Sequence, residues 1–336
     1  MSKHLKFLFT LVLIVTFFSG CGRGKHLKQY TETRQIFSTY VSVNCYYDEK
    51  VTDIFTVIAK CWERMEVIHT EMNARSNVGY VARVNESGFY GVEVSESLHG
   101  LLGESLKYSK ITEGAFDVTV YPLVELWREA AKNQKVPDKK TLAAVKDKVG
   151  YQYLVLEDAN VVHLKKKGMK IDVGAIAKGY AVDQFAEILK LNKVDDFIID
   201  AGGDIYCNGK DNGKNEWLVG VQDPINTDKI AGKLKLSNRA VTTSGDYERF
   251  SVIEGKRYSH IIDPITGFPE DIVISATVIA PSAEESDAYS TAFSVMGGDK
   301  GIKLANKLEN VEAMIIEKIG KKIKRYQSNG YKEYKG

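Results

Sequence analysis

The residues best suited to chemistry lie at positions 172–181, with the sequence DVGAIAKGYA. Asp172 precedes Gly174 and Lys178, and the apolar residues that follow recur at helical spacing, which predicts a strand end over 169–173, a glycine turn and a helix start. Backbone N–H groups and the helix dipole attract anions at such a start, and a lysine in the first turn adds positive charge. The segment therefore predicts a phosphate site. An ordinary turn with a solvated lysine explains the same residues when the segment is taken alone.

A second pair of polar residues, Asp287 and Thr291, lies four positions apart in a segment predicted to be helical. Residues at this spacing share one face of a helix, so the carboxylate and the hydroxyl converge on one point. Oxygen ligands suit a hard cation, and Mg²⁺ takes few protein ligands beside water and substrate phosphate. A carbonyl from the turn at Gly174 and Ala175 completes the predicted set. The alternative is an exposed Asp beside a Thr that bonds to its own helix.

His260 stands just before a turn signature in which Pro264 fixes φ and Gly267 is free to adopt a positive φ. A histidine in this place suits a general base or a phosphate ligand at neutral pH. A structural histidine is the competing interpretation.

Three further segments carry weaker signals. Asp117 and Phe116 suit contacts with a ribose and a flat ring, or else a buried strand start. The glycine pair in 200–204 follows an apolar strand and lets a backbone approach a ligand, although a plain turn has the same composition. Hydroxyl-rich residues 242–249 are equally common in loops.

Taken together and in order, segments 115–122, 172–183, 201–204, 243–246 with 260–267, and 287–292 resemble the FAD:protein FMN transferase (ApbE) family. The resemblance implies Mg²⁺-dependent transfer of the FMN half of FAD to a threonine hydroxyl of a partner protein, with release of AMP. At 37–39 this chain has Phe-Ser-Thr where many members have Met-Gly-Thr. The implied FAD-binding residues are Phe37, Ala115, Phe116, Asp117, Asp172, Lys178 and Ile262, the implied metal ligands are Ala175, Asp287 and Thr291, and the implied catalytic residues are His260 and Asp287.

Other functions fit the same residues. Water in place of the threonine gives a Mg²⁺-dependent FAD pyrophosphatase that releases FMN and AMP. A periplasmic FAD-binding lipoprotein without chemistry is a second alternative, and Asp287 with Thr291 argues against it because storage needs no metal pair. A structural lipoprotein leaves the ordered motifs unexplained.

The order of helices and strands expected from the sequence predicts an α+β fold in one domain, with mixed or antiparallel sheets flanked by helices. The resemblance implies an ApbE-like catalytic domain. The predicted strands are 34–47, 153–156, 197–199, 217–221, 233–236 and 313–317, and residues 116–120 are predicted to be extended. The predicted helices are 54–72, 138–150, 284–296 and 300–308. Two more helices are predicted, one capped by Ser95 and one that begins at Pro122.

The N-terminus predicts export. Basic Lys3 and Lys6 precede an apolar run from Phe7 to Phe18, which is too short to span a bilayer comfortably. Residues 18–21 resemble a bacterial lipobox, which implies a signal peptide over 1–20, acylation of Cys21, a tether over 21–33 and a domain over 34–336. A plain secretory signal with an incidental cysteine is the alternative. The predicted location is the bacterial cell envelope, on the periplasmic or outer side of the inner membrane, and the resemblance implies an exported redox-complex subunit as acceptor.

Composition limits the partners. The chain has 46 Lys and Arg against 44 Asp and Glu, a net charge of +2, so no polyanion-binding field and no nucleic-acid partner are predicted. Cys45, Cys61 and Cys207 are predicted to be buried thiols, with one disulfide left open. The basic segment 318–335 is predicted to be a solvated hairpin, and contact with a membrane surface is the alternative.

Overall fold

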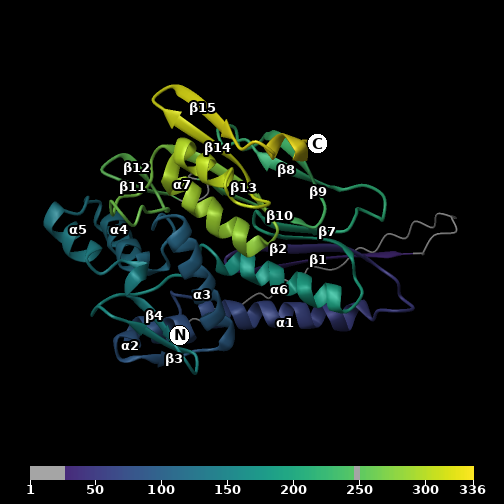
Figure 1. Ribbon diagram of the computed structural model, residues 1–336, viewed down its shortest axis with the longest axis horizontal. Helices are drawn as coiled ribbons and strands as arrows, with labels where there is room; N and C mark the ends of the chain where they lie inside the picture. The colour runs from purple at the N-terminus through teal and green to yellow at the C-terminus, as the bar shows by residue number, and fades with distance from the viewer. Residues whose placement is uncertain (1–26, 246–249) are drawn as a thin grey trace, which may run out of the picture.

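A computed structural model describes residues 27–245 and 250–336 of the chain. Its centre is an eight-stranded sheet in the order β1-β2-β6-β7-β10-β13-β14-β15, in which every neighbouring pair is antiparallel (Figure 1). These strands are β1 (Lys28–Ile36), β2 (Thr39–Tyr47), β6 (Asp196–Ala201), β7 (Asp204–Asn208), β10 (Arg239–Gly245), β13 (Val273–Ala280), β14 (Glu312–Ile319) and β15 (Lys322–Gln327).

Smaller sheets and helices surround this centre. The other strands are β3 (Val92–Glu93), β4 (Leu154–Glu157), β5 (Val161–Leu164), β8 (Trp217–Gln222), β9 (Ile230–Leu236), β11 (Phe250–Ile253) and β12 (Lys256–Ser259). The α-helices are α1 (Ile54–Met72), α2 (Tyr80–Ser87), α3 (Glu96–Ile111), α4 (Tyr121–Asn133), α5 (Lys139–Lys146), α6 (Ala177–Leu191) and α7 (Ala283–Ala305), and four 3-10 turns span Gly88–Tyr90, Val118–Val120, Tyr151–Tyr153 and Tyr331–Tyr334.

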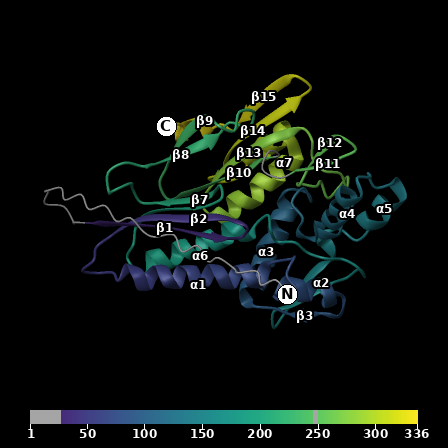
Figure 2. The ribbon, with the colours of Figure 1, turned by 180° about the vertical axis from the view of Figure 1, so that it is seen from behind.

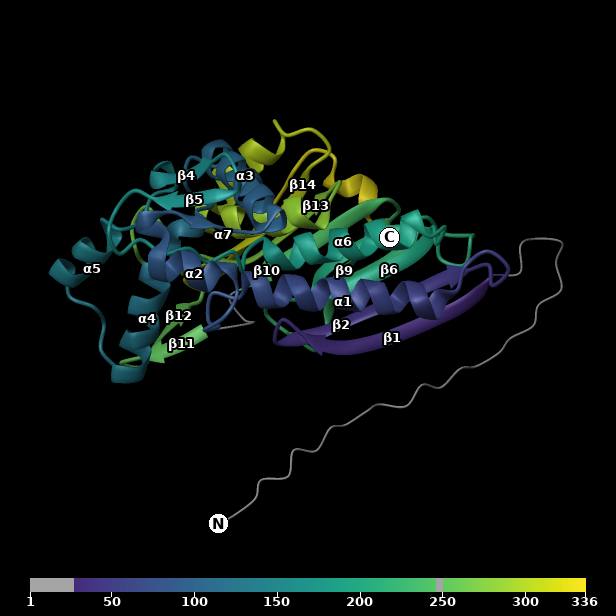
Figure 3. The ribbon, with the colours of Figure 1, turned by 90° about the horizontal axis from the view of Figure 1, so that it is seen from below.

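Helices α1, α6 and α7 cover one face of the large sheet and bury the main core against it (Figure 3). Apolar residues recur along α1 at helical spacing and bury one face of the helix, from Ile54 to Met72, while Asp53 caps the first turn by accepting the N–H of Thr56. The β8–β9 hairpin covers the opposite face around Trp217 and Leu234, close to the C-terminus (Figure 2). Strand β13 is buried along its whole length because it lies between these two layers.

A third apolar cluster joins α4, α5 and the β11–β12 hairpin, which lie together at the end of the molecule opposite β1 and β2 (Figures 1 and 3). Trp127 of α4 is its centre. The indole packs at a tilt against the rings of Tyr258 and Phe268 and donates its N–H to the carbonyl of Gly267 at 2.8 Å. This lobe and the large sheet form the two sides of the cavity described below.

The predicted α+β fold is confirmed, as are the apolar face of α1, the Ser95 cap of α3 and the start of α4 at Pro122. Asp138 caps α5, although this helix ends at Lys146 rather than near 150. The two predicted C-terminal helices form α7, which breaks at Gly297 because this residue adopts φ 76°. The basic terminal segment forms the predicted hairpin, β14 with β15.

Four local predictions are wrong. Residues 34–47 form a hairpin rather than one strand, because Phe37 and Ser38 both adopt a positive φ and reverse the chain. Strand β1 already begins at Lys28, so residues 28–33 belong to the sheet and not to a tether. The segment 116–120 tightens into a 3-10 turn around the Asp117 carboxylate, and 169–173 is irregular. Hydrogen bonds of the Asp117 carboxylate with Thr119 shape the first of these segments, and hydrogen bonds between Ile171 and Asn85 shape the second.

The three cysteines of the described chain are free and buried, so the open alternative of a disulfide is not realised among them. Burial raises the pKa of the Cys45 and Cys61 thiols to about 12. Among the described residues, none of the helices has the length and apolar character needed to cross a bilayer. Cys21 lies outside the described residues.

Candidate active site

One cavity of about 890 Å³ lies between the large sheet, the N-terminal ends of α6 and α7, and the lobe of α4 with β11–β12. Ligand sites in proteins commonly have this size. The walls contain every site residue predicted from the sequence within the described chain: Phe37, Ala115, Phe116, Asp117, Asp172, Ala175, Lys178, His260, Ile262, Asp287 and Thr291. Residues as far apart in the sequence as Phe37 and Thr291 are thus brought to one surface.

The close crossing of α6 and α7 places Asp287 against the start of α6. A side chain at Gly179 is excluded, because a Cβ atom there would lie 2.2 Å from the carbonyl oxygen of Ala283. The Asp287 carboxylate is 3% exposed and accepts the N–H of Gly179 at 3.2 Å. Burial raises the pKa of Asp287, while the charge of Lys178 and the Gly179 N–H oppose that rise. A nearby cation therefore favours the ionised form of this carboxylate.

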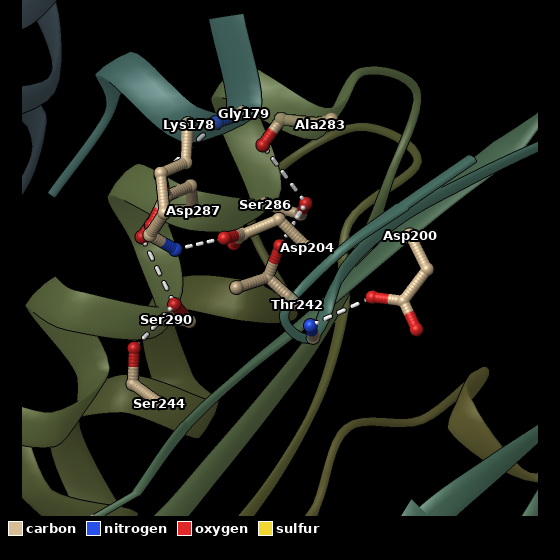
Figure 4. Close-up of polar contacts among 11 residues, drawn as sticks. Lys178, Gly179, Asp200, Asp204, Thr242, Ser244, Ala283, Ser286, Asp287 and Ser290 are labelled. Carbon is tan, nitrogen blue, oxygen red and sulfur yellow. Dashed lines mark hydrogen bonds and ion pairs between the residues drawn. The ribbon is translucent and has the colours of Figure 1, made fainter. Parts of the chain in front are cut away.

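Lys178 supplies positive charge at this point, and its ammonium also forms an ion pair with Asp204 at the start of β7 (Figure 4). Asp204 is fully buried, and its Oδ1 has no hydrogen-bond partner among the described residues. A single lysine therefore faces two buried carboxylates. Such an arrangement is costly in a low dielectric unless further positive charge or donors arrive.

Hydroxyl pairs fix α7 to the sheet beneath Asp287. Thr242 and Ser244 alternate along β10 and face Ser286 and Ser290, which lie one helical turn apart on α7. The oxygen separations are 2.8 Å and 2.7 Å. Residues two apart on the strand thus pair with residues four apart on the helix, and these pairs set the register of α7 on β10. The same register determines how far Asp287 and Thr291 lie above the sheet.

Asp183 anchors the start of α7 from α6. Its two carboxylate oxygens accept the N–H groups of Ala283 and Glu284, each at 2.8 Å. These donors belong to the first turn of α7, where helix N–H groups lack partners. Burial raises the pKa of Asp183 to about 6 despite these two bonds. Asp183 thus links the helix that carries Lys178 to the helix that carries Asp287.

Two other predicted acids shape turns at the cavity wall. Asp117 accepts the N–H and O–H of Thr119 at 2.8 and 2.7 Å and the N–H of Tyr151 at 2.8 Å. Burial raises its pKa, and these bonds counteract the rise. Asp172 accepts the N–H of Gly174 at 2.8 Å and thereby holds the turn before α6. Both carboxylates therefore position neighbouring backbone as well as lining the cavity.

Aromatic and apolar groups line the rest of the cavity. The Phe116 ring is buried against Tyr108, and Phe37 sits in the β1–β2 turn with its ring edge-on to His69 at 5.1 Å. His260 is exposed at the mouth, and Ile262 bridges to Pro269. Aromatic rings and charged groups thus border the same cavity, which suits a ligand with a flat apolar part and an anionic part.

Sequence reasoning missed several residues of this site. The sequence left residues 200–204 open between a ligand-binding turn and a plain turn and gave Asp204 no role, whereas the Gly202–Gly203 turn presents it to Lys178. The spacing of Ser286 and Ser290, parallel to that of Asp287 and Thr291, was a signal for the hydroxyl pairs. Trp127, Arg128 and Tyr258 also line the cavity and had no local signal. Asp246 of the predicted hydroxyl-rich segment lies outside the described residues.

The predicted magnesium ligands fit a hard cation in kind. A buried carboxylate at Asp287, a hydroxyl one turn later at Thr291 and the backbone at Ala175 all border the same cavity. The described chain contains no group of three or more His, Cys, Asp or Glu side chains able to hold a metal. Any metal here would rely on few protein ligands, as Mg²⁺ commonly does when a phosphate supplies the others.

An antiparallel α+β domain with one cavity of this composition belongs to the class of enzymes that act on anionic, ring-bearing small molecules. The sequence model of the ApbE family matches residues 37–315, and the chain therefore belongs to the ApbE family. The predicted family and the predicted class of enzyme, a transferase, are confirmed.

Relatives and solved structures agree with this assignment. The FAD:protein FMN transferase of Treponema pallidum is 29% identical over 91% of this chain and 89% of its own length. That of Escherichia coli K12 is 31% identical over 72% of this chain and 70% of its own. The crystal structure of the ApbE protein from Thermotoga maritima is 32% identical and covers 92% of this chain and all of its own, with a TM-score of 0.82. Flavin transferase ApbE from Vibrio cholerae has the same TM-score at 26% identity, over 92% and 99% of the two chains.

Proposed function

We propose that this protein is an FAD:protein FMN transferase, which moves the FMN half of FAD to a threonine hydroxyl of an exported acceptor protein and releases AMP. The observation that carries the proposal is the meeting of Lys178, Asp287 and Asp204 beside an aromatic-lined cavity, since a divalent cation offsets the excess of carboxylate charge and also binds a pyrophosphate. The names of the relatives support the choice of FAD and FMN.

In this proposal Phe37, Ala115, Phe116 and Ile262 contact the flavin and adenine parts of FAD, while Asp117, Asp172 and Lys178 hold its polar parts. Asp287, Thr291 and the Ala175 carbonyl would hold Mg²⁺, which supplies positive charge to the pyrophosphate. Lys178 compensates the charge that develops on the leaving phosphate. Asp204 keeps the ammonium at the cavity wall.

The reaction exchanges one P–O bond for another. The threonine oxygen attacks the phosphorus of the FMN half, and the bond from this phosphorus to the bridging oxygen breaks. AMP leaves with the bridging oxygen, and the proton of the hydroxyl passes to a base. His260, at the cavity mouth, is the proposed base. A His260→Ala variant that keeps the full transfer rate at saturating FAD would rule this role out.

The proposal also includes the place of action. The signal-like N-terminus supports export, lipidation at Cys21 and a location on the outer side of a bacterial inner membrane or in the periplasm. The acceptor is then an exported protein, and a redox-complex subunit with an FMN-binding threonine motif fits this description.

Mass spectrometry of the acceptor tests the proposal. The soluble domain, FAD and Mg²⁺ are mixed with such an acceptor, and the expected result is a mass gain of FMN less one water, absent with EDTA or in Asp287→Ala. Free FMN and AMP with unmodified acceptor would replace the transferase by a pyrophosphatase. Unchanged FAD, bound but not cleaved, would replace it by a binding protein.

A further inference from the structure

The β11–β12 hairpin has one buried and one exposed face. Side chains alternate along a strand, and Ile253 on β11 is fully buried against the cluster around Trp127. Phe250 and Val252 lie on the other face and are 49% and 47% exposed. In the register of the hairpin, Arg257 lies directly across from Val252. The described part of the hairpin thus turns an apolar pair and a guanidinium toward solvent.

This exposed face adjoins the mouth of the cavity. Phe250, Ser251, Ser259 and His260 all line the cavity, so both strands reach its edge. Val252 and Arg257 do not line it. Val252 lies between the lining residues Ser251 and Ile253, and Arg257 is next to the lining residue Tyr258. A small ligand enclosed in the cavity leaves these two side chains uncovered, whereas a large molecule that reaches into the cavity from outside covers them.

The chemistry of the face is that of a protein-binding surface. The guanidinium of Arg257 lies 3.9 Å from the centre of the Phe250 ring, which holds the cation flat beside an apolar group. Lys256, also on β12, lies 3.6 Å from Asp271. Arginine and aromatic side chains are enriched at the centres of protein interfaces. A surface of this kind favours a partner with an apolar side chain beside carboxylates.

We propose that the outer face of β11–β12, defined by Phe250, Val252 and Arg257, is the docking surface for the protein acceptor. The inference rests on the proposed transferase function, because that reaction requires a protein-borne hydroxyl to enter the cavity mouth. The acceptor places apolar and acidic groups on this face while its hydroxyl passes His260 into the cavity. Val252 and Arg257 thus contact the acceptor without lining the FAD cavity.

The test compares two variants with the same change of charge. Val252→Asp with Arg257→Glu removes the apolar contact and reverses the cation outside the cavity. Val51→Asp with Lys50→Glu is the matched control, since Val51 is 64% exposed, Lys50 is exposed, and neither borders the cavity. Each purified soluble domain is assayed with FAD, Mg²⁺ and a soluble redox-complex subunit carrying an FMN-binding threonine motif. Flavin fluorescence of the denatured acceptor reports transfer.

The expected result is an acceptor KM at least about tenfold higher in the hairpin variant, with FAD affinity and thermal unfolding equal to those of the control. The KM of the unmodified protein is expected to rise with added salt, and that of the hairpin variant to change less, because the cation has been removed. Equal acceptor KM values in the two variants would overturn the docking surface alone. An unmodified protein that labels no acceptor but binds FAD would overturn the transferase function and the docking surface with it.

Discussion

At the scale of single residues, the ion pair of Lys178 with Asp204 is the feature most open to test. We expect Asp204→Asn to fold, because it removes a buried charge whose Oδ1 already lacks a partner. The ammonium of Lys178 would then be shared with Asp287 alone and compete with a cation there. The expected result is a fall in transfer rate of about tenfold at low Mg²⁺, reduced at high Mg²⁺.

A Mg²⁺ titration of initial rates measures this effect. Glu125→Gln is the control, since it breaks the ion pair of Glu125 with Lys170 at 2.7 Å. This pair is partly exposed and does not line the cavity, and exposed ion pairs contribute little to stability. An Asp204→Asn protein with an unchanged Mg²⁺ dependence would show that Asp204 does not position Lys178.

Glu284 gives a pH dependence of stability. Burial, then Asp183 and Glu104, raise its pKa from 4.5 to about 7. The folded protein therefore binds this proton more tightly than the unfolded chain does, so the contribution to stability is full below about pH 4.5 and is lost as the pH rises through 7. Glu284→Gln removes the charge, and we expect it to raise the free energy of unfolding at pH 8 by roughly 1–2 kcal/mol.

Urea unfolding of both proteins at pH 5 and pH 8 measures this difference. At pH 5 the two proteins are expected to be nearly equal, because Glu284 is then protonated in the folded state. A gain of the same size at both pH values would assign the effect to packing rather than to charge.

Every site residue that the sequence predicted in the described chain lines the cavity, but the sequence did not define the partners of these residues. Motifs such as 172–181 and 287–291 carry their own local signals, so they were found. The pair of Lys178 with Asp204 and the bonds from Asp183 to Ala283 join residues 26 and 100 positions apart. Contacts of that range depend on tertiary packing, which no local pattern encodes.

At the scale of elements, the crossing of α6 and α7 sets the geometry of the site. We expect Gly179→Ala to lower the free energy of unfolding by at least about 2 kcal/mol, because its Cβ would meet the Ala283 carbonyl at 2.2 Å and push the helices apart. Displacement of α7 also moves Asp287 away from the Gly179 N–H, so transfer activity falls with stability.

Gly100→Ala in α3 is the matched control. Gly100 is also helical, and a Cβ there meets nothing within 4 Å, so we expect a gain of about 0.5–1 kcal/mol from helix propensity. Denaturant unfolding of both variants measures the contrast. Similar changes in the two would show that propensity, and not the close crossing, governs position 179.

Amphipathic helices were the elements best predicted, because periodicity reports directly on burial, as in α1. The failures lie where a side chain competes with the backbone. Asp117 bends 116–120 into a 3-10 turn, and the Phe37-Ser38 turn divides 34–47 although neither residue is glycine. Residues other than glycine rarely take a positive φ, so that turn had no sequence signal.

At the scale of the whole molecule, the start of β1 limits how far the domain can sit from a membrane. If Cys21 carries the lipid, residues 22–27 alone separate it from Lys28, and six extended residues span at most about 20 Å. The shortness of this connection follows from β1 beginning earlier than the sequence predicted. An acceptor for an anchored enzyme of this build must itself lie at the membrane surface.

We therefore expect Cys21→Ser to move the full-length protein from the membrane fraction to the soluble fraction, with transfer activity on a soluble acceptor unchanged. Fractionation with high-salt washes distinguishes a lipid anchor from electrostatic attachment by the basic β14–β15 hairpin. A second variant, Lys321→Glu with Lys322→Glu, tests attachment by the hairpin. A lipid anchor resists salt, because the binding is hydrophobic. Retention of Cys21→Ser on membranes, together with release of the hairpin variant by salt, would replace the lipid anchor by the hairpin as the means of attachment.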